Sequence, residues 1–176
     1  MADRRVAVVG ASGSGKTTLA RALAARLGVP YVELDSFQHG PNWAEAPTEG
    51  FRARVTEALA QPGWVIDGNY ERKIGDDVVS AADTVVWLDL SLPLILRRLW
   101  VRTRDRIRGD VELWAGNREG WRTALAGWDS LFAWAIRSHR AQRRANPTRL
   151  EALREHGVHV VRLRTPQEVE SWLARQ

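Results

Sequence analysis

Residues 10–17, which read GASGSGKT, combine three glycines, a lysine and a hydroxyl side chain in one short turn. They fit the spacing G-x-x-x-x-G-K-[ST] at every specified position. In this pattern backbone N–H groups point inward around a polyphosphate, and Cβ atoms at the glycines would block that approach. Lys16 can then reach the β- and γ-phosphates, and the Thr17 hydroxyl can ligate Mg²⁺. An apolar run precedes the segment and a helix-forming stretch follows it, which favours a phosphate-binding loop over a glycine-rich turn that binds nothing.

The residues expected to contact the phosphates are Gly10, Ala11, Ser12, Gly13, Ser14, Gly15, Lys16, Thr17 and Thr18. The helix that begins near Lys16 adds the partial positive charge of its N-terminus to this loop. Phosphates that are bound in this way belong to a nucleotide, but the loop alone is shared by motors, GTPases and kinases. The N-K-x-D segment with which GTPases read their base does not occur in this sequence, so ATP and Mg²⁺ are the expected cofactors.

Short apolar runs alternate with amphipathic stretches along the rest of the chain. Strands are expected at 4–9, 30–34, 63–70, 83–90 and 158–163, and helices at 16–27, 48–60, 92–107 and 118–144. A capping box, Thr165-Pro166-Gln167-Glu168, begins a last helix. This alternation predicts an α/β fold in three layers, with a five-stranded, mainly parallel sheet and helices on both faces. The aromatic stripe formed by Trp121, Leu125, Trp128, Phe132 and Ile136 is expected to face the core.

Composition narrows the class of protein. The 176 residues suit a single domain over 1–176, and 44% of them are apolar, which argues against disorder. The absence of cysteine excludes disulfides and thiolate catalysis and fits a reducing, cytoplasmic setting. No stretch approaches the roughly 20 apolar residues that span a bilayer, so no membrane association is expected.

Charge is unevenly distributed. The net charge is +5, but residues 97–149 alone carry 13 arginines against five acidic residues. This basic block predicts an anionic partner or, more simply, a solvated helical face. We expect it to include an arginine-rich lid and helical region at about 97–145.

Two aspartates end apolar runs at the same expected edge of the sheet. Asp35 follows the run 30–34, and Asp67 ends the run WVID. Ligands in open α/β sheets lie beyond the carboxyl ends of the strands, so both carboxylates are expected beside the phosphate loop. A turn aspartate before Gly68 and a helix cap are the structural alternatives.

Side chains that follow these two strand ends are candidates for an acceptor pocket with aromatic walls. They are Phe37, His39, Trp43, Asn69, Tyr70 and Arg72.

The motifs GASGSGKTTLA, ELDSFQHGPNW, WVIDGNY and ADTVVWLDL, with GNRE more loosely, resemble the adenylate kinase-like small kinases. More narrowly, they are similar to the bacterial topology-modulation or adenylate kinase-related group. The resemblance implies the P-loop NTPase fold and phosphoryl transfer from ATP. In true adenylate kinases the third strand ends in D-G-[FY]-P-R, whereas here Asp67-Gly68-Asn69-Tyr70 stands in that place, so AMP is not implied as the acceptor.

The resemblance also implies roles for the carboxylates. Asp67 would hold Mg²⁺ through water or orient Thr17. By similarity to shikimate-type kinases, Asp35 would accept a proton from an acceptor hydroxyl or ligate Mg²⁺.

For the lid, the resemblance implies that arginines close over ATP, because their forked guanidinium groups match phosphate oxygens. Arg98 and Arg102 would lie near the transferred group, and Arg104 would contact the nucleotide. The loop that contains Thr165 would pack against the adenine.

These observations predict an ATP-dependent kinase that phosphorylates a small nucleotide-like or hydroxylated acceptor, with a slight preference for the nucleotide-like class. Two alternatives remain open. The basic block would suit a nucleic-acid-binding protein or a polynucleotide 5′-kinase, although its aromatic residues keep helical spacing rather than alternating with basic ones. A regulator that binds ATP without transferring phosphate would carry the same loop.

Overall fold

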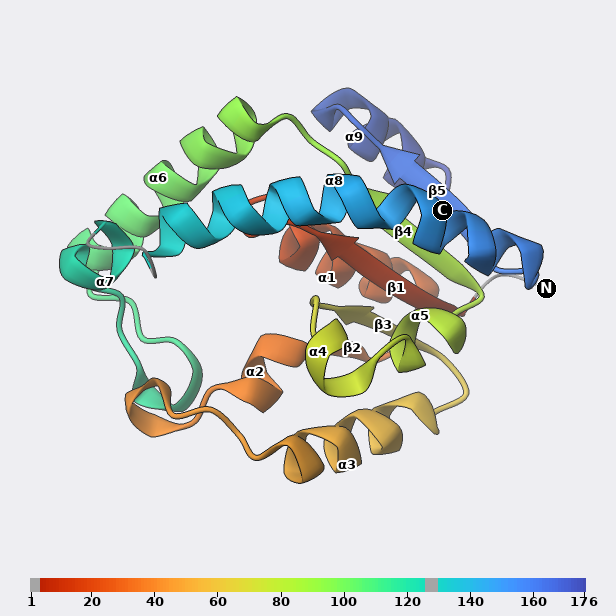
Figure 1. The fold of residues 1–176 in the computed structure, drawn as a ribbon, viewed down its shortest axis with the longest axis horizontal. Coiled ribbons are helices and arrows are strands. Elements are labelled where there is room, and N and C mark those ends of the chain that lie inside the picture. Colours follow the sequence, from red (N-terminus) through yellow and green to blue (C-terminus); the bar gives the residue numbers. More distant parts are fainter. Residues whose placement is uncertain (1–3, 126–129) are drawn as a thin grey trace.

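The computed structural model describes residues 4–125 and 130–176. Its centre is a five-stranded sheet in the order β2-β3-β1-β4-β5, in which every neighbouring pair of strands is parallel. The strands are β1 (Arg5–Gly10), β2 (Tyr31–Glu33), β3 (Trp64–Asp67), β4 (Thr84–Leu88) and β5 (His159–Leu163). The expected α/β fold, with a five-stranded parallel sheet and helices on both faces, is therefore confirmed (Figure 1).

The helices that connect the strands cover both faces of the sheet. They are α1 (Lys16–Leu27), α2 (Leu34–Gln38), α3 (Thr48–Leu59), α4 (Glu71–Ile74), α5 (Asp77–Ser80), α6 (Leu92–Arg108), α7 (Trp121–Leu125), α8 (Leu131–Glu155) and α9 (Pro166–Ala174). Two short 3₁₀ turns, η1 (Pro41–Trp43) and η2 (Trp114–Gly116), lie in the loops after α2 and α6.

Strand β1 shows how the sheet divides the core into two layers. Val6 and Val8 pack on the side of α1 and α9, where Leu23 and Trp172 are buried. Ala7 and Val9 face the opposite layer, which α3, α4, α5 and the last turns of α8 cover. Because successive strand residues point to opposite faces, a short run such as RVAVVG is buried on both sides without any polar alternation.

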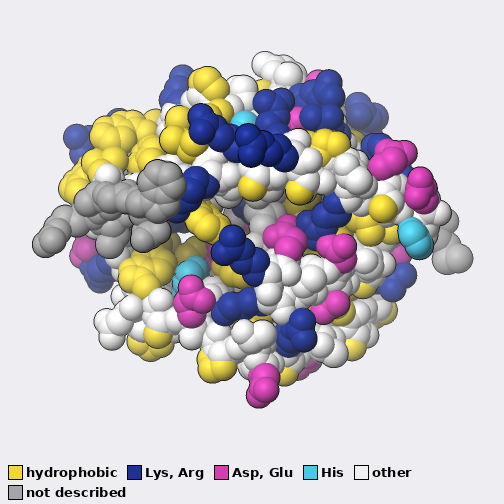
Figure 2. All heavy atoms as spheres, in the orientation of Figure 1, with side chains coloured by type: hydrophobic (Ala, Val, Ile, Leu, Met, Phe, Trp, Pro, Cys, Tyr) yellow, Lys and Arg dark blue, Asp and Glu magenta, His cyan; other side chains and the backbone are white. Residues whose placement is uncertain are grey.

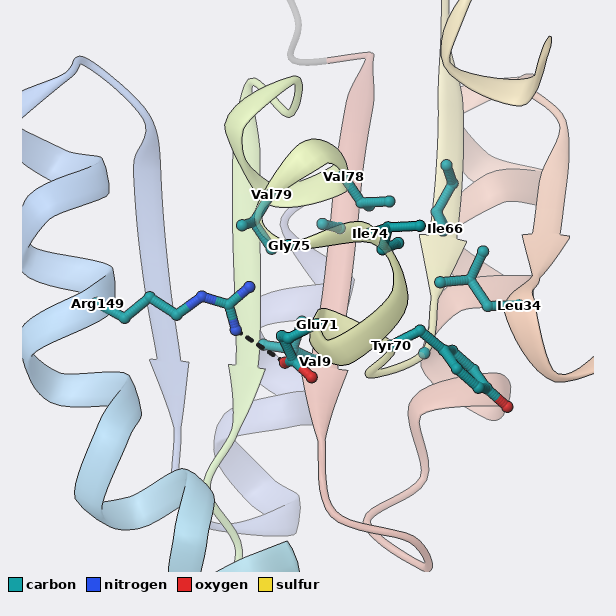
Figure 3. A pocket seen from close by; sticks show the side chains of 12 residues that line it. Val9, Leu34, Ile66, Tyr70, Glu71, Ile74, Gly75, Val78, Val79 and Arg149 are labelled. Atoms are coloured by element: carbon teal, nitrogen blue, oxygen red, sulfur yellow. Dashed lines mark hydrogen bonds and ion pairs between the residues drawn. The ribbon is translucent and has the colours of Figure 1, made fainter. Parts of the chain in front are cut away.

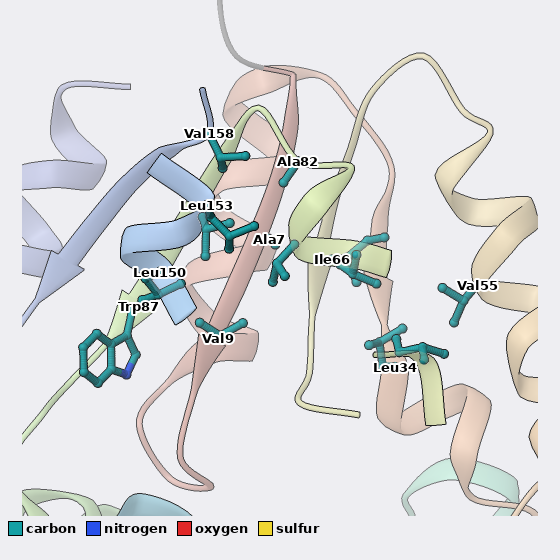
Figure 4. Packing of buried hydrophobic residues seen from close by; sticks show 14 of the residues in the cluster. Ala7, Val9, Leu34, Val55, Ile66, Ala82, Trp87, Leu150, Leu153 and Val158 are labelled. Carbon is teal, nitrogen blue, oxygen red and sulfur yellow. The ribbon is translucent and has the colours of Figure 1, made fainter. Parts of the chain in front are cut away.

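The second layer is the larger of the two. Figure 4 shows Leu150 and Leu153 of α8 beside Val9, together with Ile66 on the neighbouring strand. Phe51 and Val55 of α3 close the same cluster from the β2 side of the sheet. The core therefore joins the N-terminal half of the chain directly to α8.

The prediction of one long helix over 118–144 is wrong in both its position and its extent. The structure has a short α7 and a separate α8, and α8 continues through Pro147 to Glu155. Proline normally breaks a helix because it lacks an N–H group and its ring crowds the preceding turn. Here the buried Leu150 and Leu153, which follow the proline, hold the last turns of α8 against the sheet.

The expectation that the aromatic stripe faces the core is wrong for its first members. Trp121 and Leu125 on α7 are exposed, and Trp121 meets the exposed Trp100 of α6 with ring centroids 5.5 Å apart. The break between α7 and α8 explains this, because the stripe needed one uninterrupted helix to stay on one face. Trp128 lies outside the described residues.

Basic side chains gather over α8 on the face drawn in Figure 2. Arg140 and Arg144 of α8 are exposed, as a solvated helical face predicts, whereas Arg143 pairs with the buried Asp89 at 2.9 Å. Within 4–125 and 130–176, no helix combines the length and the apolar character needed to cross a membrane.

A small pocket lies between α4, α5 and the sheet, and its lining is largely apolar (Figure 3). Val9, Ile66 and Val79 form part of its wall, and Arg149 closes the rim through an ion pair with Glu71 at 2.8 Å. The same arginine pairs with Asp76 at 2.5 Å. This ion pair fastens α8 to the turn that carries Tyr70.

Leu23 offers a test of the first core layer, because it is fully buried between α1 and the sheet. Leu23→Ala removes apolar contacts and leaves a cavity, so the free energy of unfolding should fall by about 3 kcal/mol. Urea unfolding followed by circular dichroism measures this change. Glu57→Ala on the exposed side of α3 is the control, and equal stabilities of the two variants would contradict the layer assignment.

Candidate active site

The loop between β1 and α1 is built to present backbone rather than side chains. Gly15 is the N-terminal cap of α1 and has φ 97°, a left-handed conformation that favours glycine. Gly10 has φ 154°, and a Cβ atom there would lie 2.9 Å from the Leu88 carbonyl oxygen and from Ser14 Oγ. The Lys16 side chain folds back across the turn, with Nζ 3.4 Å from the Ala11 carbonyl oxygen. The loop therefore has the concave shape that the glycine spacing predicts.

Asn69 supports this loop from the neighbouring strand. Its Nδ2 donates to the Gly10 carbonyl oxygen at 2.6 Å, and its Oδ1 accepts from the Gly10 amide at 3.2 Å. Asn69 was expected in the acceptor pocket, but both ends of its side-chain amide hold the first glycine of the loop instead. The pairing of β1 with β3 makes this possible, because it brings the two strand ends together.

Arg98 of α6 reaches the other side of the loop. One terminal nitrogen of its guanidinium group donates to the Ser14 carbonyl oxygen at 3.1 Å. The structure thus brings Arg98 to the phosphate loop, and the same nitrogen lies 3.4 Å from the position that a Cβ atom on Gly15 would take.

Asp67 lies at the carboxyl end of β3 and is buried. Burial raises the pKa of its carboxyl group to about 6, and Glu33 and Asp35 push in the same direction, whereas Lys16 and Thr17 oppose the rise. Its Oδ2 atom receives no hydrogen bond from any residue that the structure describes. A buried carboxylate oxygen without a partner is expected to accept a bond from a ligand, a water molecule or a metal ion.

Glu33 is a site residue that the sequence analysis missed. It pairs with Asp67 in the register of β2 and β3, and its Oε1 lies 3.4 Å from the Thr17 hydroxyl. Arg21 lies 3.3 Å from the same carboxylate. The sequence did contain a signal for Glu33. It lies at the end of a strand, two residues before Asp35, so both acidic residues are found at the same edge of the sheet.

Asp35 lies in the first turn of α2, directly after β2. The Tyr70 hydroxyl donates to its Oδ1 at 2.6 Å. Burial raises the pKa of Tyr70, and the neighbouring Asp35 raises it further, so the phenol stays protonated and remains a donor. One oxygen of Asp35 is therefore fixed by Tyr70, which orients the carboxylate.

Arg102 lies one turn after Arg98 on α6. Burial and the neighbouring Arg106 lower the pKa of its guanidinium group, while Glu119 and Asp35 counteract them. Its Nε atom is buried and has no hydrogen-bond partner among the described residues. Arg106 itself is paired with Glu119 at 2.7 Å. Of the two neighbouring arginines, Arg102 is therefore the one available to bind a ligand.

Aromatic rings close the site on the side of α2. His39 stacks on Trp114 with ring centroids 5.6 Å apart, and Trp43 meets His39 edge-on at 5.4 Å. Trp114 also lies close to Glu33, with its indole nitrogen 3.4 Å from Oε2. Phe37 is covered by Arg54, whose guanidinium group lies 4.0 Å from the ring centroid. Trp114 was not expected here, and the glycine-containing loop WAGN around it was the signal that could have indicated it.

Four further expected site residues are not tested by these contacts. Thr18 directly follows Thr17 in the first turn of α1, with an exposed side chain, and Arg72 is exposed as well. Arg104 pairs with its neighbour Asp105 at 2.8 Å. The Thr165 hydroxyl accepts from the Glu168 amide at 3.1 Å and so caps α9, as the capping box predicts. The roles of these four residues in binding stay predictions.

Magnesium fits the oxygen donors at this edge of the sheet. Thr17, Asp67 and Glu33 supply a hydroxyl and two carboxylates, and Asp67 Oδ2 is the buried acceptor without a partner. Mg²⁺ usually binds through one or two carboxylates plus substrate phosphates rather than through a complete protein cage. The described residues contain no cluster of three or more His, Asp or Glu side chains that could hold a metal ion.

The fold and the loop define a P-loop protein, and comparisons with known proteins agree. Residues 6–66 match the family described as "ATPase family associated with various cellular activities (AAA)". A shikimate kinase of Synechococcus elongatus is 32% identical over 110 residues, which cover 52% of this chain and 55% of the relative. The chain thus matches only about half the length of this curated relative.

Solved structures share the fold over almost the whole chain. A shikimate kinase from Acinetobacter baumannii in complex with shikimate has a TM-score of 0.59 at 19% identity, covering 99% of this chain and 90% of the other. A gluconokinase from Sinorhizobium meliloti has a TM-score of 0.54 at 18% identity, covering 98% and 93%. The similarity is therefore to P-loop small kinases, with shikimate kinases and a gluconokinase as the named relatives rather than adenylate kinases.

The burial of Asp67 predicts how the free energy of unfolding changes with pH. The folded chain holds the Asp67 proton more tightly than the unfolded chain, since the pKa rises from 3.8 to about 6. The stability that Asp67 contributes therefore falls as the pH rises between these values, and the full penalty is present above about pH 6. Asp67→Asn should remove that penalty and raise the free energy of unfolding at pH 8, by about 3 kcal/mol at most.

Urea unfolding in metal-free buffer, at several pH values between about 4 and 8, measures this effect. The gain of Asp67→Asn over the native chain should shrink toward the acid end. Asp77→Asn, at an exposed position on α5, is the matched control and should show no such trend. A gain that does not depend on pH would rule out ionisation of Asp67 as its cause.

Proposed function

We propose that this protein is an ATP-dependent kinase that transfers the γ-phosphoryl group to a hydroxyl group of a small acceptor. One observation carries the proposal. Ser14 Oγ in the phosphate loop and Asp67 Oδ2 at the end of β3 are buried polar atoms without partners, and so is Nε of Arg102, whose guanidinium group is influenced by Glu33 and Asp35. Native proteins rarely leave such atoms unpaired, so their convergence at one edge of the sheet supports a charged ligand there.

The residues divide into those that hold the phosphates and those that serve the acceptor. The loop amides, Lys16 and the N-terminus of α1 would hold the β- and γ-phosphates. Thr17 and Asp67, with Glu33 beside them, would hold Mg²⁺, which when bound neutralises charge on the phosphate oxygens. Arg98 and Arg102 would contact the phosphoryl group in transfer, where arginine forks match its oxygens.

Asp35 would act on the acceptor. An alcohol loses a proton as it attacks phosphorus, and a carboxylate within hydrogen-bond reach can accept that proton. Tyr70 fixes one oxygen of Asp35 and leaves the other for the acceptor. The wall of His39, Trp43 and Trp114 would lie beside the acceptor and exclude water.

The surroundings of Asp35 favour a hydroxyl acceptor over a nucleoside monophosphate. Glu33 and Asp35 both lie close enough to Asp67 to raise its pKa, and an acceptor phosphate would be repelled by all three carboxylates. Arg72, which is expected in the acceptor pocket, is exposed, and Arg52 donates to the Lys73 carbonyl oxygen, so neither is seen to offset these charges. The named relatives, shikimate kinases and a gluconokinase, support the same choice. The narrower likeness to the adenylate kinase-related group rests on the sequence motifs.

A coupled assay of ADP release against a panel of acceptors tests the proposal. The panel contains shikimate, gluconate, other sugar acids, nucleosides, nucleoside monophosphates and a 5′-hydroxyl oligonucleotide. Acceptor-dependent ADP release with a hydroxylated compound is expected. Release with the oligonucleotide alone would favour a polynucleotide kinase, and ATP binding without release for any compound would favour a regulator.

Lys16→Ala should abolish most of the acceptor-dependent ADP release while the fold is kept. Lys16 supplies positive charge where negative charge develops on the phosphates, and the loss of one such group costs on the order of 10²–10³ in rate. Arg144→Ala, at an exposed position on α8, removes a charge elsewhere and serves as the control. Full activity of a folded Lys16→Ala protein would refute the phosphate-loop assignment.

Asp35→Asn separates the two classes of acceptor. If Asp35 takes the proton of a hydroxyl, kcat should fall by roughly 10²–10⁴ while the KM for the acceptor changes little. The amide keeps the size of the side chain, so the loss reports proton transfer rather than packing. Steady-state kinetics at saturating Mg²⁺, with Asp77→Asn as the matched control, measure it. A fall in kcat of less than about tenfold would argue against a base and for a phosphate group as the acceptor.

A further inference from the structure

Two loops that are far apart in the sequence have the same construction and meet in space. Residues 39–45 are closed by an antiparallel bridge between His39 and Glu45, and residues 112–118 by one between Glu112 and Arg118. We call them the α2 loop and the α6 loop, after the helices that precede them. Each contains one 3₁₀ turn, and the two turns lie against one another where the α6 loop descends to the α2 loop (Figure 1).

Asn117 makes the junction between the two loops. Its Oδ1 accepts from the Trp43 amide at 2.9 Å, and its Nδ2 donates to the Gly40 carbonyl oxygen at 2.8 Å. Nδ2 also donates to the Trp114 carbonyl oxygen of its own loop at 2.8 Å. Asn117 is only 5% exposed. A buried amide that uses both of its ends holds its partners in one relative position, because any shift leaves a buried polar group unpaired.

The backbone of the α2 loop needs this support. Asn42 and Trp43 have φ values of 55° and 59°, in the left-handed region. A residue as bulky as tryptophan rarely adopts that conformation, which costs roughly 1–2 kcal/mol per residue. The amide of Trp43 is the group that Asn117 holds. Strained backbone of this kind persists where the surrounding structure fixes it, and it is concentrated at functional sites.

The two ends of the α2 loop are fastened to different parts of the molecule. At its base Lys73 of α4 contacts the Gln38 Oε1 atom at 2.8 Å and the Ala46 carbonyl oxygen at 2.9 Å. At its tip the loop is held by Asn117. The base is therefore fixed by the body of the fold, and the tip by the segment that follows α6.

That segment is also tied to the groups that face the phosphates. Glu119, two residues after Asn117, pairs with Arg106 at 2.7 Å, and it influences Arg102. Trp114 stacks on His39 and lies next to Glu33. A nucleotide that draws in Arg98 and Arg102 would therefore act on α6 and, through Glu119, on Asn117.

We infer that Asn117 is a positioning residue that completes the acceptor site by holding the α2 loop against the α6 loop. This inference rests on the proposed function, because it takes the α2 loop as a wall of the acceptor site. The wall that contains His39 and Trp43 is then formed by the α2 loop together with the α6 loop. The α6 loop follows the helix that carries Arg98 and Arg102. The consequence is coupling: nucleotide on the phosphate loop stabilises the docked α6 loop, which orders the α2 loop before the acceptor arrives.

Amide hydrogen exchange tests this inference without a known acceptor. The native chain, Asn117→Ala, Asn117→Asp and the control Glu112→Ala are compared with and without Mg²⁺ and the non-hydrolysable analogue AMP-PNP. Without nucleotide, Asn117→Ala should speed exchange in 39–45 by roughly tenfold while the strands exchange as before, because a buried hydrogen-bond network is lost. Asn117→Asp keeps the oxygen that accepts from Trp43 and should lie between the two. Glu112 is exposed in the same loop, so its variant should resemble the native chain.

With nucleotide, the native chain should gain protection at 10–17 and also at 39–45. In Asn117→Ala the protection at 10–17 should remain and that at 39–45 should be lost. The inference is overturned if AMP-PNP protects 39–45 equally in both proteins, or if it protects 10–17 but not 39–45 in the native chain. Absence of any protection at 10–17 would instead count against nucleotide binding, and the nucleotide-free comparison would still decide the role of Asn117.

Discussion

Like charges meet at the carboxyl ends of β2 and β3, and the arrangement of the site follows from this crowding. The register of the sheet sets Glu33 beside Asp67, and Asp35 begins the helix that follows β2 directly. Burial disfavours the ionised form of Asp67, Glu33 and Asp35 add to this effect, and the pKa of Asp67 rises to about 6. Lys16 relieves only part of this repulsion. The fold therefore keeps a site whose charges are better balanced with a cation bound than without one, at a cost in stability that functional sites commonly carry.

The phosphate loop is held from two sides, so that it does not collapse onto these carboxylates. Asn69 fixes the backbone of Gly10, and Arg98 holds the Ser14 carbonyl oxygen. Both contacts come from elements outside the loop, one at the end of β3 and one on α6. Groups that are fixed in advance need no reorganisation when charge arrives, which is the condition under which electrostatic stabilisation is largest. Under the proposed function, these two residues make a flexible glycine-rich turn rigid enough for phosphoryl transfer.

Local patterns in the sequence were sufficient for the fold and the loop but not for the contacts between distant loops. Buried β-branched runs and the glycine spacing predict the parallel sheet and the loop, since both depend on neighbours along the chain. Glu33, Trp114 and Asn117 were not predicted because the partners that make them important lie 16 to 81 residues away in the sequence. The break between α7 and α8 was missed for the opposite reason, because a regular apolar stripe imitates one continuous helix. Asn69 was correctly predicted to lie near the site, but its side chain binds the backbone of Gly10 rather than facing the acceptor pocket.

Under the proposed function, the balance of charge around the acceptor side also explains why the aromatic wall is built from two loops. The hydroxyl group that would be phosphorylated is neutral and gives the carboxylate edge little electrostatic attraction, so its placement must come from shape, from exclusion of water and from a few oriented polar groups. His39 and Trp114 supply flat faces from opposite loops, and Asp35, fixed by Tyr70, supplies an oriented group that can accept a proton.

A substrate that accepts the phosphoryl group on a phosphate would need the reverse, a ring of unpaired arginines. In the described residues the basic groups near this wall are largely engaged already, Arg106 with Glu119 and Lys73 with backbone and Gln38. Arg102 keeps a free buried Nε, which suits the transferred phosphoryl group that approaches from the phosphate loop. The same division, cations toward the nucleotide and a carboxylate with aromatic rings toward the acceptor, is the one that transfer to an alcohol requires.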